Sequence, residues 1–504
     1  MHAAIRRIIF IAILYSSPVW AADYQVGPGQ NYANIGDVPW ESLAAGDRVL
    51  IHARPAPYQE KWVLNRVGTA ANPIIVRGVP DANGTLPVIQ GAGATTRSKL
   101  NYWNEDRGIL KIGGSNKPDD GTPAYIRVEN LHFRSARGSF TGRNGPSTYL
   151  SNAAGIYVEK GDHISVSNCE LEDSGNGLFV AAATTDMLIE GNYIHGNGNV
   201  NSIYEHNTYT AARGILYQYN RFGPLCDGCL GNNLKDRSSG TVIRYNWIES
   251  GNRQLDLVDA EDSSELVNDP AYLQTFVYGN VLIEPNGAGN SQIVHFGGDS
   301  GDTSIYRGKL YFWNNTVVST RTGNTTLLRL SSNAQTAEVR NNIIYVTEAG
   351  NRLALTNSDG TLLYGGNLFK PGFVASHSEL NGVVTDIGGN RVAAGPGFVD
   401  EANQDFHIQE TSPARDAAGS LPVFLAAYPL EREYLKHQSG LPRLADSHLD
   451  VGAFEYPTAV IERSLSVTFS GNGNGAVRSV QGGLYCAGNC SGMFGHGVQV
   501  SLLA

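Results

Sequence analysis

The chain has 504 residues, a formal net charge of −10, only 17% charged residues and 59 glycines. Nucleic-acid-binding proteins are typically basic, so this acidic balance excludes a general nucleic-acid partner. A glycine-rich chain with few charges favours short strands and tight turns over helices.

The first 21 residues form a segment of their own. Arg6 and Arg7 precede the apolar run IIFIAILY, and the segment ends on the small residue Ala21. This pattern predicts a signal peptide over residues 1–21 and a secreted or periplasmic protein. No apolar run reaches the ~20 residues that a membrane helix needs, so we expect no membrane span.

The five cysteines fall into two close pairs and one single residue. Cys226 and Cys229 are three residues apart, and Cys486 and Cys490 are four apart. In an exported protein, both pairs are expected to be disulfides. Cys169 follows an apolar strand and is expected to be a buried thiol.

One short phrase recurs along the chain: alternating apolar residues, then an asparagine, then an apolar pair. Examples are VIRYNWIE, FVYGNVLI and YFWNNTVV. The spacing between successive asparagines is 24 to 38 residues, which indicates a solenoid with a period of about 25 residues and insertions. The asparagines are Asn130, Asn168, Asn192, Asn220, Asn246, Asn280, Asn315, Asn342 and Asn367.

Strand periodicity combined with this repeat predicts an all-β fold, a right-handed parallel β-helix over residues 22–456 with a cap at each end. The asparagines would lie at a bend in each coil, tolerate a left-handed conformation and stack as an internal ladder. Residues 23–456 resemble the parallel β-helix proteins of the pectate-lyase superfold. Residues 457–504 resemble the small β-repeat modules of bacterial surface proteins, which implies attachment or spacing, with the Cys486–Cys490 pair as a staple.

The repeat also predicts which outward-facing side chains are neighbours. Lys235 lies 11 residues before Asn246, and Tyr209 lies 11 residues before Asn220, so the two should stack. Extending the register gives one row of Tyr209, Lys235, Asp256 and His295, and a parallel row of His206, Asn232 and Arg253. Arg237 should point the same way as Lys235, because strand side chains alternate.

The charges around these rows differ from those of the whole chain. Between residues 213 and 253 there are six basic and three acidic residues, a balance that suits an anionic ligand. An acidic cluster follows directly. Its carboxylates are hard oxygen ligands, so Asp256, Asp259 and Glu261 are expected to form a calcium site.

The stretch 235–246, KDRSSGTVIRYN, resembles the K-S-S-G-N…R-Y-N phrase of β-helix polysaccharide lyases of the alginate lyase and chondroitinase B type. The resemblance implies Lys235 as the base, an arginine as the acid or charge partner, and a Ca²⁺ ion at the substrate carboxylate. Two features depart from the pattern. Asp236 and Arg237 separate the lysine from Ser238, and RQLDLVD stands where the family has L-R-H-G.

β-Elimination at a uronic acid sets clear demands on a site. The proton at C5 must go to a base, and a lysine whose pKa is depressed by Arg237 and Arg253 could take it. The same two arginines, or Ca²⁺, would neutralise the carboxylate. Tyr209 or His206 would protonate the leaving oxygen. Further substrate contacts are expected from Asn232, Asn207 and His295.

The sequence therefore predicts a monomeric lyase that acts on an acidic polysaccharide. Three alternatives stay open. A glycoside hydrolase on the same fold would use Asp256 and Asp259 as its carboxylate pair. A C5-epimerase would share the proton abstraction. A cell-surface carbohydrate-binding protein or adhesin would use the β-helix as a rod.

Overall fold

The computed structural model describes residues 21–444, 448–456, 462–471, 476–479, 484–486, 488–495 and 500–503. The expected signal peptide lies outside the described residues, apart from Ala21. Within the described part of the chain, no helix has both the length and the apolar character needed to cross a bilayer.

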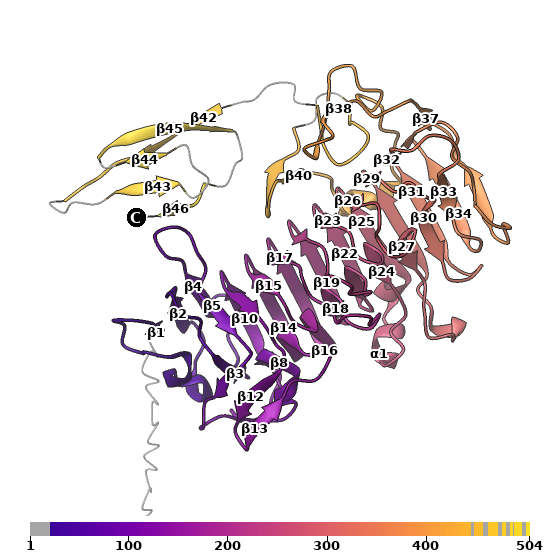
Figure 1. Ribbon diagram of the computed structural model, residues 1–504. Helices are drawn as coiled ribbons and strands as arrows, with labels where there is room; N and C mark the ends of the chain where they lie inside the picture. The colour runs from indigo at the N-terminus through magenta and orange to yellow at the C-terminus, as the bar shows by residue number, and fades with distance from the viewer. Residues whose placement is uncertain are drawn as a thin grey trace, which may run out of the picture.

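The chain winds into a stack of coils whose strands form three long parallel sheets, as the sequence repeat predicted (Figure 1). Two of the sheets are joined where the long strands β14 (Ala154–Ser167) and β16 (Asn176–Glu190) bend from one into the other. The architecture is a parallel β-helix, and its helices are confined to short segments: α1 (Ser264–Val267), η1 (Ile35–Asp37), η2 (Trp40–Ser42), η3 (Glu105–Arg107), η4 (Pro270–Leu273), η5 (Thr303–Ile305) and η6 (Val423–Ala427).

The first sheet, called the groove sheet below, carries the candidate site. Besides the first halves of β14 and β16, it contains β3 (Glu60–Leu64), β8 (Gly108–Ile112), β18 (Thr208–Thr210), β21 (Leu234–Asp236), β24 (Leu255–Leu257), β27 (Gln292–Phe296), β30 (Thr325–Leu330) and β33 (Leu353–Thr356).

The second sheet continues from the second halves of β14 and β16. It contains β1 (Asp23–Val26), β2 (Arg48–His52), β4 (Ile74–Val79), β10 (Ala124–Glu129), β19 (Arg213–Gln218), β22 (Ser239–Arg244), β25 (Gln274–Tyr278), β28 (Lys309–Trp313), β31 (Thr336–Arg340), β34 (Thr361–Gly365) and β36 (Val383–Asp386).

The third sheet closes each coil. It contains β5 (Val88–Gln90), β11 (His132–Arg134), β15 (Glu170–Glu172), β17 (Tyr193–Ile194), β20 (Arg221–Phe222), β23 (Trp247–Glu249), β26 (Val281–Glu284), β29 (Thr316–Ser319), β32 (Ile343–Val346), β35 (Leu368–Phe369) and β37 (Arg391–Val392).

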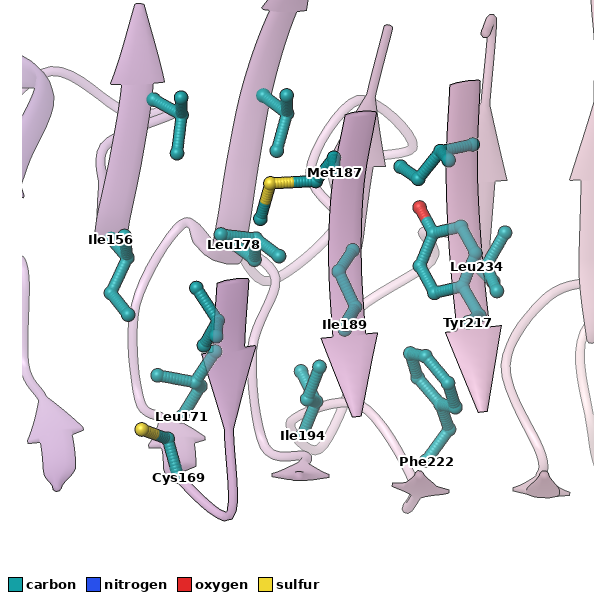
Figure 2. Packing of buried hydrophobic residues seen from close by; sticks show 14 of the residues in the cluster. Ile156, Cys169, Leu171, Leu178, Met187, Ile189, Ile194, Tyr217, Phe222 and Leu234 are labelled. Atoms are coloured by element: carbon teal, nitrogen blue, oxygen red, sulfur yellow. The ribbon is translucent and has the colours of Figure 1, made fainter. Parts of the chain in front are cut away.

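Inward-facing apolar side chains from all three sheets fill the interior of the coils. Leu178, Met187, Ile189 and Ile194 pack beside one another there (Figure 2), and each is at most 1% exposed. Because side chains alternate along a strand, the same strands present every second residue to solvent. The core therefore fixes which residues face outward on the groove sheet.

A ladder of buried asparagines runs along the bend between the second and third sheets. In each step the backbone N–H and the side-chain amide of one asparagine donate to Oδ1 of the next, as Asn220 does to Asn246 at 3.0 and 2.9 Å. The ladder runs through Asn192, Asn220, Asn246, Asn280, Asn315, Asn342, Asn367 and Asn390. The predicted ladder is confirmed for seven of its asparagines and extends to Asn390.

Two expected ladder members occupy a different position. Asn130 and Asn168 have φ of +57° and +52°, so they are the left-handed bend residues that precede the ladder position. In the coil of Asn168 the ladder position belongs to Cys169, whose backbone N–H donates to Asn192 Oδ1 at 2.9 Å. The left-handed conformation thus belongs to the residue before the ladder, where Tyr219 and Tyr245 also have positive φ.

Short strands flank the coils, most of them in antiparallel pairs. At the N-terminal end these are β6 (Thr95–Thr96), β7 (Asn101–Tyr102), β9 (Ser115–Lys117), β12 (Ser139–Gly142) and β13 (Gly145–Thr148), and after the last coil β38 (Phe398–Asp400), β39 (Asp405–Ile408), β40 (Arg432–Leu435) and β41 (Ser439–Pro442). Two separate small sheets outside the stack contain β42 (Glu462–Val467), β43 (Val477–Ser479), β44 (Tyr485–Cys486), β45 (Cys490–Gly495) and β46 (Leu502–Leu503). Both expected disulfides are present, and Cys169 is a buried free thiol.

Candidate functional site

The predicted row of outward-facing residues exists on the groove sheet. Tyr209 pairs with Lys235, Lys235 with Asp256, and Asp256 with His295. The register therefore holds across the long insertion between Asp256 and His295. The same row continues one coil further, to Arg329.

The second predicted row lies beside the first. The backbone N–H of Asn232 donates to His206 Nδ1 at 2.9 Å, and Asn233 N–H donates to the carbonyl of Arg253 at 2.8 Å. Both rows line one cavity of about 680 Å³. We call this cavity the groove. Its lining also includes Tyr204, Asp299, Tyr306 and Ser331.

Strand alternation explains the charge pattern of β21. Lys235 and Arg237 face the groove, whereas Asp236 between them points inward and is fully buried. Asp236 accepts hydrogen bonds from Ser238 Oγ at 2.6 Å and Thr241 Oγ1 at 2.7 Å, and its ion pair with Arg307 spans 2.9 Å. This buried pair fixes the strand from which the two cations project.

Asp256 is the centre of the polar contacts in the groove. It accepts hydrogen bonds from Asn232 Nδ2 at 2.6 Å and from His295 Nδ1 at 2.8 Å, and Lys235 Nζ lies 3.3 Å from Oδ2. Burial raises the pKa of Asp256, but the His295 hydrogen bond and the cations Lys235 and Arg253 outweigh it. The pKa is held well below its usual range, so Asp256 is ionised at neutral pH.

Lys235 is clamped between two carboxylates. Its Nζ lies 2.6 Å from Asp299 Oδ2 in addition to its contact with Asp256. Burial lowers the pKa of Lys235, but the charges of Asp256 and Asp299 outweigh burial and the Arg237 charge, and the pKa lies above its ordinary 10.5. The expectation that neighbouring cations depress this pKa is therefore wrong.

Arg237 has no N–H group left for a substrate carboxylate. Its Nε donates to Tyr209 Oη at 2.8 Å, Nη1 donates to the Asp259 carbonyl and to Asp259 Oδ1 at 3.3 Å, and Nη2 lies 2.8 Å from Glu261 and 3.0 Å from Asp299. Through these contacts Arg237 orients Tyr209 and stabilises the surrounding loops. These contacts do not support the expected role of Arg237 in binding a substrate carboxylate.

Two other arginines are more open to a ligand. The Arg253 guanidinium donates to Gln292 Oε1 at 3.0 Å and lies 3.9 Å from Asp256. Arg329, half-buried in the groove lining, has no hydrogen-bond or ion-pair partner for its guanidinium among the residues that the structure describes. Both arginines can therefore bind an anionic ligand without first breaking a close ion pair.

His206 is neutral in this environment. Burial lowers its pKa to about 3, and the Lys235 charge acts in the same direction. Because Nδ1 accepts the Asn232 N–H, the ring proton of the neutral form lies on Nε2. His206 is then a neutral hydrogen-bond donor, and of the two expected acids Tyr209 is the one that remains.

Asn207 does not reach the groove. It is fully buried, and its amide donates to Asn233 Oδ1 at 2.8 Å and to the Gly223 carbonyl at 2.9 Å. Together with Asn197, which donates to Asn207 Oδ1 at 3.0 Å, it forms a second interior ladder. The expected substrate contact of Asn207 is corrected to a structural role.

The expected calcium ligands do not converge. Asp259 is fully buried and accepts from Arg237, from Asp299 N–H and from Ser300 Oγ, whereas Glu261 pairs with Arg237. Since cations and donors already occupy these carboxylates, Asp256, Asp259 and Glu261 do not fit a Ca²⁺ ion.

Two other clusters in the described part of the chain have possible metal-binding geometry: His132 with Glu170 and Glu172, and Asp162 with His163 and Asp186. Neither cluster contributes to the lining of the groove.

The same contacts bear on the hydrolase alternative. An inverting hydrolase needs one carboxylic acid that is protonated at the working pH. The depressed pKa of Asp256 and the fully engaged carboxylate of Asp259 leave neither residue suited to that role.

Several residues of the groove were missed from the sequence, among them Asp299, Tyr306, Arg329 and Ser331. Asp299 lies in the loop GGDSGD directly after β27, and such a turn carries no repeat signal that would place it beside Lys235. Arg329 could have been found, because it continues the register row by one coil beyond His295.

Comparisons with known proteins agree with this architecture. No family model and no curated protein matches the sequence. Among solved structures, pectate lyase Pel9A superposes with a TM-score of 0.50 at 13% identity, over 86% of this chain and 96% of that one. An alginate lyase from Paenibacillus sp. str. FPU-7 superposes with a TM-score of 0.39 at 13% identity, over 64% of this chain and 91% of that one. The chain thus shares the parallel β-helix fold of pectate lyase Pel9A over most of its length.

Proposed function

We propose that the chain is an exported enzyme that cleaves an acidic, uronate-containing polysaccharide by β-elimination. The observation that carries this proposal is the groove itself, in which Lys235 lies between Tyr209 and the open cations Arg253 and Arg329. Adjacent coils are ~4.8 Å apart, which is comparable to the length of one sugar unit. Successive coils can thus contact successive sugars.

Arg253 and Arg329 bind the uronate carboxylate in this proposal. Abstraction of the C5 proton puts negative charge onto that carboxylate, so a cation beside it stabilises the transition state. Asn232 supports the same region, because its Oδ1 is buried and accepts no hydrogen bond from any described residue. A sugar hydroxyl can supply the missing donor.

Lys235 acts as the base in its neutral form. Its Nζ takes the C5 proton, the electrons form the C4–C5 double bond, and the C4–O bond breaks. The carboxylate of the substrate also brings a negative charge that competes with Asp299 for the cations in the groove. Asp299 lies in an exposed turn, so its contact with Lys235 is the one that can open.

Tyr209 protonates the leaving oxygen. Arg237 Nε–H donates to Tyr209 Oη, which leaves the hydroxyl proton free to point into the groove. The tyrosine ring stacks on Phe179 with a centroid distance of 4.9 Å, which holds its orientation. The neutral His206, 5.8 Å from the Tyr209 ring between centroids, offers a donor to a sugar hydroxyl.

The test is the ultraviolet absorbance of unsaturated uronate product during incubation with a panel of uronate polymers. We expect the wild type to produce it and Lys235→Ala to lose it. Lys309→Ala is the matched control, because Lys309 lies on the second sheet and pairs with Glu338. New reducing ends without unsaturated product would instead indicate hydrolysis, and binding without any cleavage would favour the carbohydrate-binding protein.

A further inference from the structure

Three residues of neighbouring coils form a continuous hydrogen-bonded chain at one side of the groove. Asp256 Oδ1 lies 2.8 Å from His295 Nδ1, and His295 Nε2 lies 2.9 Å from Ser331 Oγ. The residues come from β24, from β27 and from the position directly after β30. All three line the groove.

The direction of the hydrogen bonds follows from the charge states. Asp256 is ionised, so it accepts the proton of His295 Nδ1. Burial lowers the pKa of His295 despite the opposing effect of Asp256, so the ring is neutral at pH 7 and Nε2 carries a lone pair. Nε2 can therefore accept the hydroxyl proton of Ser331. This is the arrangement of a nucleophile, its base and the carboxylate that orients the base.

Ser331 is placed to meet a substrate. It is half-buried rather than enclosed. The N–H of Gly298 donates to its Oγ at 2.9 Å, and the Phe296 carbonyl, 3.1 Å from Oγ, is a second acceptor for the one hydroxyl proton beside His295 Nε2. Arg329 lies two residues earlier, on β30, and lines the same groove, with its guanidinium donors unpaired among the described residues.

We propose that Ser331 is the nucleophile of a second activity in this groove, the hydrolysis of a carboxylic ester carried by the bound saccharide. The inference rests on the proposed function only for the saccharide that carries the ester. Asp256 takes part in both activities, through Oδ2 to Lys235 and through Oδ1 to His295.

The chemistry balances without a cofactor. Ser331 Oγ attacks the ester carbonyl while His295 Nε2 takes the hydroxyl proton, and Arg329 donates to the oxygen that becomes negative. The ester C–O bond then breaks, and the proton on His295 passes to the departing alcohol. Water, deprotonated by His295, attacks the acyl-serine; the acyl C–O bond breaks, the proton on His295 returns to Ser331 Oγ, and the carboxylic acid is released.

Ser331→Ala is the discriminating variant, with Ser332→Ala as its control, because Ser332 Oγ donates to Gln335 and does not line the groove. Two probes are used with the full chain: a fluorophosphonate, located by peptide mass spectrometry, and 4-nitrophenyl acetate. We expect labelling at Ser331 and a loss of about 100-fold or more in ester hydrolysis in Ser331→Ala alone. Circular dichroism and thermal unfolding check that this variant folds.

Polymer substrates then identify the ester. Release of acetate from acetylated uronate polymers would indicate an O-acyl ester, and release of methanol from methyl-esterified polymers would indicate the uronate ester. The two activities have separate readouts, released acetate or methanol for ester hydrolysis and unsaturated uronate for elimination, so the loss of one is distinguished from the loss of the other. If the wild type is not labelled at Ser331 and hydrolyses none of these esters faster than Ser331→Ala does, the proposal is overturned and the serine only ties two coils together.

Discussion

At the scale of single residues, the resting groove holds the proposed base, Lys235, in its protonated form. Lys235 is a cation between Asp256 and Asp299, and its pKa lies above 10.5. A residue that must lose a proton before it acts makes the rate depend on the small neutral fraction. Two predictions follow from this clamp.

The first prediction concerns the pH dependence of the wild type. Below the pKa of Lys235, the neutral fraction rises about tenfold per pH unit. Between roughly pH 7 and pH 9, kcat/KM for elimination should therefore also rise about tenfold for each pH unit. Initial rates at substrate concentrations below KM measure this slope. A plateau that begins near neutral pH would contradict the role of Lys235 as the base.

The second prediction concerns Asp299→Asn. Asp299 stabilises the protonated form of Lys235, so removal of its charge should lower the lysine pKa and move the rising limb of the pH profile to lower pH. At pH 8 the variant should then be several-fold faster than the wild type. Asp302→Asn is the control in the same loop, because the Asp302 side chain bonds only Ser304 among the described residues. An unchanged pH profile in Asp299→Asn would show that the contact with Asp299 does not determine the pKa of the catalytic base.

At the scale of structural elements, the asparagine ladder sets the register of the coils. Each rung joins two neighbouring coils through buried hydrogen bonds, and the groove rows depend on the resulting alignment. The ladder ends at Cys169, whose Sγ lies 3.4 Å from the Ser167 carbonyl and 3.8 Å from the Val128 carbonyl. The side-chain amides of the ladder take the equivalent carbonyls, as Asn192 Nδ2 does with Val166 at 2.9 Å.

The third prediction follows from that equivalence. Cys169→Asn should extend the ladder by one rung, because the new amide can donate to Asn192 Oδ1 and to the Val128 carbonyl. The free energy of unfolding should increase by about 1 kcal/mol, the net value of a typical buried hydrogen bond. Denaturant unfolding measures it, with Cys169→Ser as the control that removes the thiol without adding an amide. Destabilisation by Cys169→Asn beyond that of the serine variant would show that this rung cannot accept an asparagine.

At the scale of the whole molecule, the sequence predicted more of the fold than of the site. The period-2 strands and repeated asparagines were enough for the parallel β-helix and for the row from Tyr209 to His295, because register in a solenoid is periodic. Periodicity could not reveal the clamp on Lys235, since Asp299 comes from a loop. Nor could it show that Asn207 points inward, because that depends on where its coil bends.

The fourth prediction concerns the C-terminal residues, which we propose to be a separate attachment module. The last turns before residue 456 belong to the solenoid, as Asn314 Nδ2 donates to the Asp450 carbonyl at 3.0 Å and Ala453 N–H donates to Thr316 Oγ1 at 3.0 Å. A chain that ends at residue 456 should therefore keep its thermal unfolding transition and its rate on dissolved polymer. A chain shortened to residue 444 loses these contacts and should unfold at lower temperature, which differential scanning calorimetry can compare. A large loss of activity in the longer chain would contradict a separate module.

The register of the groove sheet has a consequence for how such a site can change over time. Asp256 and His295 are direct neighbours although 39 residues separate them, and the intervening segment carries α1 and η4. The strands of the coils thus have fixed relative positions. The loops that connect them form a rim, and the strand pairing does not limit the length of these loops. A lineage can lengthen or reshape that rim, and so select a different sugar, without moving any of the reacting groups relative to one another.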